Sequence, residues 1–198
     1  MNEYVISQNE KIRILIIKKR SAFWIANMKN TPSTLQGTTA EVFRCTYKET
    51  KVAVKLFYEL QAPEARKEIE LVFELRHPNV VGILGFFQIE NSGKVGIIFE
   101  LCALGDLTSA YKKDWFTDSV RLKILWGCAR ALCYMHSFPV PIVHRDLKCG
   151  NIFVTDDCVG KVGDCGASRR IDLNSTMTQV GTPVYAAPEI LKGRRYDE

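Results

Sequence analysis

A cluster of side chains able to bind a metal ion and handle a proton lies between His144 and Asn151, where the sequence reads His-Arg-Asp-Leu-Lys-Cys-Gly-Asn. Asp146 supplies a carboxylate, Lys148 a positive charge and Asn151 an amide, and Asp164 follows in a second short loop. Carboxylate and amide oxygens are ligands that Mg²⁺ prefers. A bound Mg²⁺ beside a lysine suits phosphoryl transfer, in which positioning and charge neutralisation do most of the work.

Apolar segments on both sides of the first loop must hold it in place. Val140-Pro-Ile-Val143 precedes the loop and Ile152-Phe-Val154 follows it, and both favour strands. A helix is predicted over Asp118–Ser137, because Thr117 or Asp118 can cap it and apolar residues recur at helical spacing. The expected buried face of this helix consists of Leu122, Leu125, Ala129, Leu132, Met135 and His136.

The run from His144 to Asn151 resembles the catalytic loop of protein kinases, and Asp164-Cys165-Gly166 resembles their metal-binding Asp-Phe-Gly motif. A later segment, Gly181 to Glu189, resembles their substrate-side loop and its Ala-Pro-Glu ending. The resemblance covers residues 31–198 and implies a bilobal α+β fold. It assigns a β-rich N-lobe with one helix to residues 31–101 and an incomplete α-rich C-lobe to residues 102–198, with residues 1–30 as an unassigned extension.

The catalytic roles follow from the resemblance. Asp146 is expected to accept or orient the proton of the substrate hydroxyl, and Lys148 to neutralise the transferring phosphate. Lys55, at the end of Val-Ala-Val-Lys, is expected to contact the α- and β-phosphates of ATP, steadied by Glu68 on a helix near residues 63–76. The residues expected to hold Mg²⁺ are Asn151 and Asp164.

The nucleotide site is carried over in the same way. By resemblance, the Glu100 carbonyl and the Cys102 backbone meet the adenine, Asp106 reaches the ribose, and Phe99 closes the pocket behind the adenine. The residues expected around ATP are Gly37, Val42, Ala53, Lys55, Glu100, Cys102, Asp106 and Phe153.

The motifs His-Arg-Asp-Leu-Lys-x-x-Asn and Gly-Thr-Pro-x-Tyr-x-Ala-Pro-Glu resemble those of serine/threonine kinases, and their contexts resemble the tyrosine-kinase-like group, Raf relatives included. This resemblance implies phosphorylation of a protein substrate with ATP and Mg²⁺. The alternative is a pseudokinase or nucleotide-binding scaffold. Two departures from the family favour that alternative: Gly37 is the only glycine retained in the phosphate loop, and Cys165 replaces the motif's phenylalanine. A P-loop nucleotide hydrolase is not supported, because Gly-x-x-x-x-Gly-Lys-Ser/Thr does not occur.

Two expectations concern the end of the chain. The stretch Ser168–Gln179 resembles an activation loop, and phosphorylation of Ser175, Thr176 or Thr178 is expected to order it by pairing with Arg145. The family's later helices are absent from this sequence, so we expect a truncated domain. The apolar residues Leu122, Leu125, Trp126, Ala129, Leu132 and Cys133 cover more than one side of the long helix, so we expect part of this surface to stay uncovered and the chain to associate through it.

Composition narrows the class of protein. The chain has 198 residues, 46% of them apolar and 25% charged, with a net charge of +5 from scattered lysines and arginines, which favours a globular protein that binds no nucleic acid. Seven cysteines without metal-like spacing, no signal peptide and no transmembrane segment indicate a cytoplasmic location. Apolar residues between Ile12 and Ala26 fall at roughly helical spacing and predict a helix, with a leader or a membrane-surface helix as alternatives.

Overall fold

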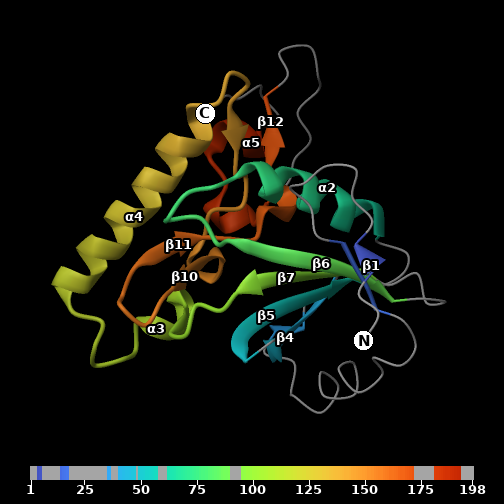
Figure 1. Ribbon diagram of the computed structural model, residues 1–198. Helices are drawn as coiled ribbons and strands as arrows, with labels where there is room; N and C mark the ends of the chain where they lie inside the picture. Colours follow the sequence, from blue (N-terminus) through green and yellow to red (C-terminus); the bar gives the residue numbers. More distant parts are fainter. Residues whose placement is uncertain are drawn as a thin grey trace. The chain divides into compact units, whose positions relative to one another are not determined.

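The structure is a computed structural model that describes residues 4–5, 14–17, 35–36, 40–47, 49–57, 62–89, 95–171 and 181–192 (Figure 1). The chain divides into two compact units. The first consists of Met1–Phe73 and Gly82–Leu101, and the second of Glu74–Val81 and Cys102–Glu198.

The first unit contains a seven-stranded sheet with the strand order β1-β2-β6-β7-β5-β4-β3. The strands are β1 Tyr4–Val5, β2 Ile14–Ile17, β3 Leu35–Gln36, β4 Ala40–Tyr47, β5 Thr50–Phe57, β6 Ile83–Ile89 and β7 Val95–Glu100. The pairings within the series β3-β4-β5-β7-β6 are all antiparallel. Glu49 forms the turn between β4 and β5 with a positive φ of 67°. Strands β4 and β5 therefore form an antiparallel hairpin.

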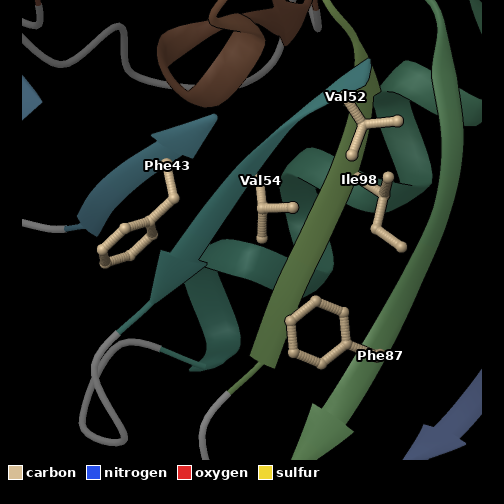
Figure 2. Packing of buried hydrophobic residues seen from close by; sticks show 5 residues of the cluster. All are labelled: Phe43, Val52, Val54, Phe87 and Ile98. Atoms are coloured by element: carbon tan, nitrogen blue, oxygen red, sulfur yellow. The ribbon is translucent and has the colours of Figure 1, made fainter. Parts of the chain in front are cut away.

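Strand β5 sends alternate side chains to the two faces of this sheet, as the pleat of a strand requires. Val52 and Val54 are fully buried and join one apolar cluster with the rings of Phe43 and Phe87 and with Ile98 (Figure 2). On the other face, a second buried cluster contains Ala40, Phe57, Ile69, Val95 and Ile97.

The helix α2, Ala62–Glu74, contributes to the second cluster. Ile69 lies in this cluster, and Phe73 packs against it with its ring edge-on to Phe86. The burial of Ile69 places its neighbour Glu68 close to the same face of the sheet. The expected helix is confirmed, and it ends at Glu74 rather than Arg76.

The helix predicted near the N-terminus is wrong at Ile14–Ile17, which forms strand β2. Strand β2 pairs in parallel with β6, from Ile14 opposite Phe86 to Ile17 opposite Ile89, and β1 pairs antiparallel with β2. A four-residue apolar run has no decisive period, and three of these residues are β-branched isoleucines, which fit a pleated surface. The rest of the predicted helix lies outside the described residues.

The second unit contains short strands and helices. Its strands are β8 Gly105–Asp106, β9 Ile142–Val143, β10 Ile152–Val154, β11 Gly160–Val162 and β12 Arg169–Arg170. They form a three-stranded sheet of order β11-β10-β8 and a pair of β12 with β9. The helices are α3 Leu107–Ala110, α4 Asp118–His136 and α5 Pro188–Leu191.

Helix α4 begins after Thr117, whose hydroxyl oxygen accepts a hydrogen bond from the Val120 N–H. Its buried residues are Ile124, Gly127, Cys128, Ala131 and Met135. The predicted buried face was therefore right at Met135 and wrong at Leu122, Leu125 and Ala129. Leu122 and Leu125 are 69% and 57% exposed, Ala129 is exposed as well, and Leu132 and His136 are half-buried. The helix carries apolar residues around most of its circumference, so periodicity alone selected the wrong face.

Of the six apolar residues expected to include an uncovered surface, the described part of the chain leaves Leu122, Leu125, Trp126, Ala129 and Cys133 exposed, while Leu132 is half-buried. Association through this surface stays a prediction. Among the described helices, none has both the length and the apolar character that crossing a bilayer requires.

Candidate functional site

The hairpin of β10 and β11 brings the two expected metal ligands to one end of the second unit. Asn151 directly precedes β10 and Asp164 follows β11 by two residues, and Ile152 pairs with Val162. The Gly163 N–H donates to the Asn151 carbonyl at 2.9 Å, which closes this end of the hairpin. An antiparallel hairpin places residues far apart in sequence side by side, so the loops bearing the two side chains are adjacent.

A glycine is required between β11 and Asp164. A Cβ at Gly163 would lie 2.8 Å from a Val81 methyl group and 2.9 Å from the Phe153 ring. Asp164 itself has left-handed backbone angles, with φ 54° and ψ 64°, a conformation that costs energy for residues other than glycine. Such strain occurs often at functional sites, where the surrounding structure holds it.

Asp146 lies at the centre of a hydrogen-bond network. Its Oδ1 accepts from the Thr182 N–H at 3.0 Å and from the Thr182 hydroxyl at 2.7 Å. Its Oδ2 accepts from Asn151 Nδ2 and lies beside Lys148 Nζ, each at 2.8 Å. Lys148 Nζ also donates to the Thr182 hydroxyl oxygen at 2.8 Å. The network holds one carboxylate, one amide, one ammonium group and one hydroxyl in fixed positions.

This network sets the charge of Asp146. Burial opposes ionisation, but hydrogen bonds from Lys148, Thr182 and Asn151 and the charge of Lys148 outweigh it, so the pKa of Asp146 is lowered. The carboxylate is therefore ionised at neutral pH. A base with a low pKa is a weak proton acceptor, which favours orientation of a hydroxyl group over early removal of its proton.

The network also orients Asn151. Its Nδ2 donates to both the carbonyl oxygen and Oδ2 of Asp146, each at 2.8 Å. Because the amide nitrogen is committed to Asp146, the amide oxygen is the atom that faces away from Asp146. That oxygen has the chemistry of a Mg²⁺ ligand.

Gly181 allows Thr182 to approach Asp146. Gly181 has a φ of 110°, and a Cβ there would lie only 2.3 Å from the Arg145 carbonyl oxygen. A side chain at this position would therefore push the segment that carries Thr182 away from the catalytic loop. Thr182 thereby lies within hydrogen-bond distance of both Asp146 and Lys148.

His144 connects the loop that carries Asp146 with the loop that carries Asp164. It is 2% exposed, and its Nε2 donates to the Gly163 carbonyl at 2.9 Å, while Nδ1 accepts from the Asp146 N–H at 3.4 Å. Burial lowers the pKa of His144, although the hydrogen bond to Gly163 and the charges of Asp164 and Asp146 act in the opposite direction. The imidazole is thus neutral at pH 7 and serves as a packing and hydrogen-bonding residue.

The lowered pKa of His144 predicts an acid-sensitive fold. The unfolded imidazole binds a proton near its ordinary pKa of 6.5, whereas the folded one resists protonation. The free energy of unfolding therefore falls as the pH drops below about 6.5. His144→Asn removes this titration, so denaturant unfolding between about pH 7 and pH 5 should show a smaller pH slope than the parent.

His136→Asn, at the end of α4, removes a different imidazole and serves as the matched control. Some slope should remain in His144→Asn because desolvation, Arg130 and Lys161 also lower the pKa of His77. Equal slopes in the parent and His144→Asn would contradict the assignment.

In the first unit, Lys55 and Glu68 form the expected ion pair. Lys55 Nζ lies 3.0 Å from Glu68 Oε1 and 2.8 Å from Oε2, and the two side chains are 15% and 2% exposed. Strand β5 supplies the lysine, and Ile69, buried next to Glu68, fixes the helix that supplies the glutamate. A buried pair of this kind needs both members, because a single charge left behind is costly.

Three other residues expected to contact the nucleotide lie in the same sheet. Val42 pairs with Lys55 across β4 and β5, and Ala53 pairs with Phe99 across β5 and β7. Glu100 ends β7, and its Oε1 accepts the Gly82 N–H at 2.6 Å while its own N–H donates to the Gly82 carbonyl. These two bonds fix Glu100, and the sequence motifs gave no sign of them.

The second unit holds the other residues expected around the nucleotide. Cys102 is buried, and Phe153 on β10 pairs with Asp106 on β8. Asp106 also caps α3, because its Oδ1 accepts the Ser109 N–H at 3.0 Å, a role that the sequence analysis did not anticipate. Gly37 lies outside the described residues. The roles of all these residues toward ATP remain predictions.

Comparison with known families decides what kind of domain this is. Residues 35–198 match the protein kinase domain. The chain belongs to the protein kinase family. The α+β kinase fold expected from the sequence is thereby confirmed, with a β-rich sheet followed in sequence by the loops that carry Asp146 and Asp164.

The kinase domain is similar to several curated proteins. The putative serine/threonine-protein kinase/receptor R826 of Acanthamoeba polyphaga mimivirus is 34% identical over 172 residues, which are 82% of this chain and 10% of that protein. The probable serine/threonine-protein kinase drkD of Dictyostelium discoideum is 33% identical over 82% of this chain and 13% of its own length. The serine/threonine-protein kinase VIK of Arabidopsis thaliana is 33% identical over 82% of this chain and 40% of its own length. The kinase chain thus spans less than half the length of these relatives.

Proposed function

We propose that this chain is an ATP-dependent protein serine/threonine kinase that transfers a phosphate to a protein hydroxyl group. The observation that carries the proposal is the network around Asp146, in which Lys148, Thr182 and Asn151 contact one carboxylate. The relatives named as serine/threonine kinases support the choice of substrate class. Membership of the tyrosine-kinase-like group, with Raf relatives, is a further part of the proposal and rests on the motif contexts around His144 and Asn151.

In this proposal each part of the network has one task. Asp146, ionised by its surroundings, orients the substrate hydroxyl group and takes its proton late in the transfer. Lys148 lies beside Asp146 and neutralises charge on the transferring phosphate. Lys55, held by Glu68, binds the α- and β-phosphates. Such fixed charges stabilise a transition state without reorganisation at the moment of reaction.

Mg²⁺ fits the donor atoms of the second unit. The Asn151 amide oxygen faces away from Asp146, and the Asp164 carboxylate is exposed on the adjacent loop. Bound there, the ion supplies charge neutralisation for the phosphate oxygens. Asn151 and Asp164 would hold it, and Glu100, Cys102, Asp106 and Phe153 would contact the nucleoside.

The test is transfer of radiolabelled phosphate from Mg²⁺-ATP to a mixed protein acceptor, followed by identification of the phosphorylated amino acid. Label on serine or threonine that disappears in Asp146→Asn supports the proposal. ATP binding without transfer supports the alternative of a pseudokinase or nucleotide-binding scaffold. The loss of glycines from the phosphate loop and the presence of Cys165 favour that alternative. Label on tyrosine alone contradicts the substrate class.

Mg²⁺-ATP should raise the melting temperature of the parent chain. A ligand that binds only the folded state stabilises it by RT ln(1 + [L]/Kd), which is about 2.7 kcal/mol at a hundredfold excess over Kd. The shift should need the metal and should be lost in Asp164→Ala, as measured by scanning fluorimetry with and without a chelator. The control is Asp156→Ala, an exposed carboxylate in the turn after β10. An unchanged melting temperature at millimolar ATP would contradict the site.

Phosphorylation of Ser175, Thr176 or Thr178 should raise activity through Arg145. These three residues lie outside the described part of the chain. Arg145 Nε donates to the Ala167 carbonyl at 2.6 Å, while one terminal guanidinium nitrogen is buried and has no hydrogen-bond partner among the described residues. A phosphate supplies about −1.5 to −2 charge and acceptor oxygens that satisfy such a group. The phosphorylated parent should transfer phosphate to a protein substrate faster than the variant in which all three residues are alanine. Equal rates of transfer would contradict the hypothesis.

A further inference from the structure

The ring of Phe57 lies against the ammonium group of Lys55. The two residues are separated by one position on β5, so their side chains leave the same face of the sheet. Lys55 Nζ is 5.1 Å from the centre of the Phe57 ring, within the distance of about 6 Å over which the face of an aromatic ring attracts a cation. Phe57 is only 2% exposed, so this contact is shielded from water.

The ring is held firmly in this position. Phe57 pairs with Ala40 on β4 and with Val95 on β7, and all three belong to one buried cluster. Ile69, from helix α2, completes the cluster. The residue before Ile69 is Glu68, which binds the same ammonium group. One helical segment therefore fixes both the carboxylate and the ring that contact Lys55.

We propose that Phe57 is a positioning residue for Lys55, which keeps the ammonium group in place and charged. The N–H groups of Lys55 donate hydrogen bonds to the Glu68 carboxylate. If the proposed function holds, they also donate to the phosphates of ATP. An aromatic face attracts the ammonium group without requiring one N–H direction. The ring therefore holds Nζ while its hydrogen bonds are shared between glutamate and phosphate. None of the motifs that carry the kinase resemblance includes Phe57.

The sharpest test changes the electrostatics of the ring and keeps its size. Phe57 is replaced by pentafluorophenylalanine in the full chain, which removes the negative face of the ring. The control is the same replacement at Phe43, a buried ring in the cluster on the other face of the sheet (Figure 2), with no cation contact recorded in the described part of the chain. Phe57→Leu and Phe43→Leu form a second matched pair made of natural residues.

The first readout needs no activity. Acylation of Lys55 by an amine-reactive ester is followed by peptide mass spectrometry without nucleotide, because only the neutral amine reacts. Loss of the negative face destabilises the ammonium form and should speed labelling by about 3- to 10-fold at mildly alkaline pH. The same change at Phe43 should leave the rate unchanged. Unchanged labelling at Phe57, or an equal change at Phe43, overturns the proposal.

The second readout is the Kd for Mg²⁺-ATP, which should rise by about 3- to 10-fold in the Phe57 variant and not in the Phe43 variant. An unchanged Kd in a parent that binds ATP overturns the role toward the phosphates. If the parent binds no ATP but the Phe57 variant is labelled faster than the parent, the positioning of Lys55 by Phe57 is supported. That outcome counts against the proposed nucleotide site instead.

Discussion

Asp146→Asn should lower the rate of phosphate transfer by about 10²- to 10⁴-fold, the contribution expected of a positioned base. Both oxygens of Asp146 accept hydrogen bonds, Oδ1 from Thr182 and Oδ2 from Asn151 and Lys148. An amide has one acceptor and one donor end, so whichever way it turns, a donor faces a donor. The variant therefore loses the negative charge and also the arrangement of the groups around it.

The measurement is single-turnover transfer from saturating Mg²⁺-ATP, which separates chemistry from nucleotide binding. Asp156→Asn is the control, since Asp156 is exposed and lies on the turn between β10 and β11. Its rate should stay within about twofold of the parent, as expected for a surface substitution. A rate for Asp146→Asn within about tenfold of the parent would assign the proton to another group.

Lys55→Met should weaken nucleotide binding and also lower the free energy of unfolding. The substitution keeps a long apolar side chain but leaves Glu68, whose side chain is 2% exposed, without the lysine that lies 2.8 Å away. Removal of one partner of a buried ion pair typically costs about 3–5 kcal/mol. Because Lys55 is 15% exposed, we expect a loss near the lower limit, about 3 kcal/mol in the free energy of unfolding.

A double substitution separates the two effects. In Lys55→Met with Glu68→Leu, an apolar pair replaces the ion pair, an exchange that is often neutral or stabilising. Denaturant unfolding should therefore return toward the parent value, while binding of Mg²⁺-ATP stays lost. Lys51→Met, at an exposed position on the same strand, serves as the control for stability. A double variant that is no more stable than Lys55→Met, or that binds ATP like the parent, would contradict this interpretation.

Much of the candidate site could be predicted because its residues are local in sequence. Asp146, Lys148 and Asn151 lie within one loop, and the short hairpin that follows brings Asp164 to the same end. Apolar segments of strand length on both sides of the loop were enough to place them. The pairing of Lys55 with Glu68 spans a strand and a helix, and it was found only because the kinase resemblance fixes their spacing.

Other features depend on partners that the local sequence does not reveal. Residues 14–17 form strand β2 because they pair with the edge of β6. The four residues themselves carry no pattern that predicts this pairing. The buried face of α4 is set by what packs against Ile124 and Met135, whereas Leu122 is equally apolar and exposed. The cap that Asp106 places on α3 likewise depends on the turn of the chain there.

The pairing of β2 with β6 bears on where the folding unit of this kinase begins. The family match starts at residue 35, yet the sheet that carries Lys55 continues through β6 into residues 14–17 and then 4–5. A fragment cut at residue 35 would leave the backbone N–H and C=O groups of β6 without the strand that pairs with them here. Open strand edges are templates for pairing between molecules, so such a fragment invites self-assembly into aggregates. The natural boundary for expression and crystallisation therefore lies ahead of Tyr4, well outside the region that family resemblance delimits.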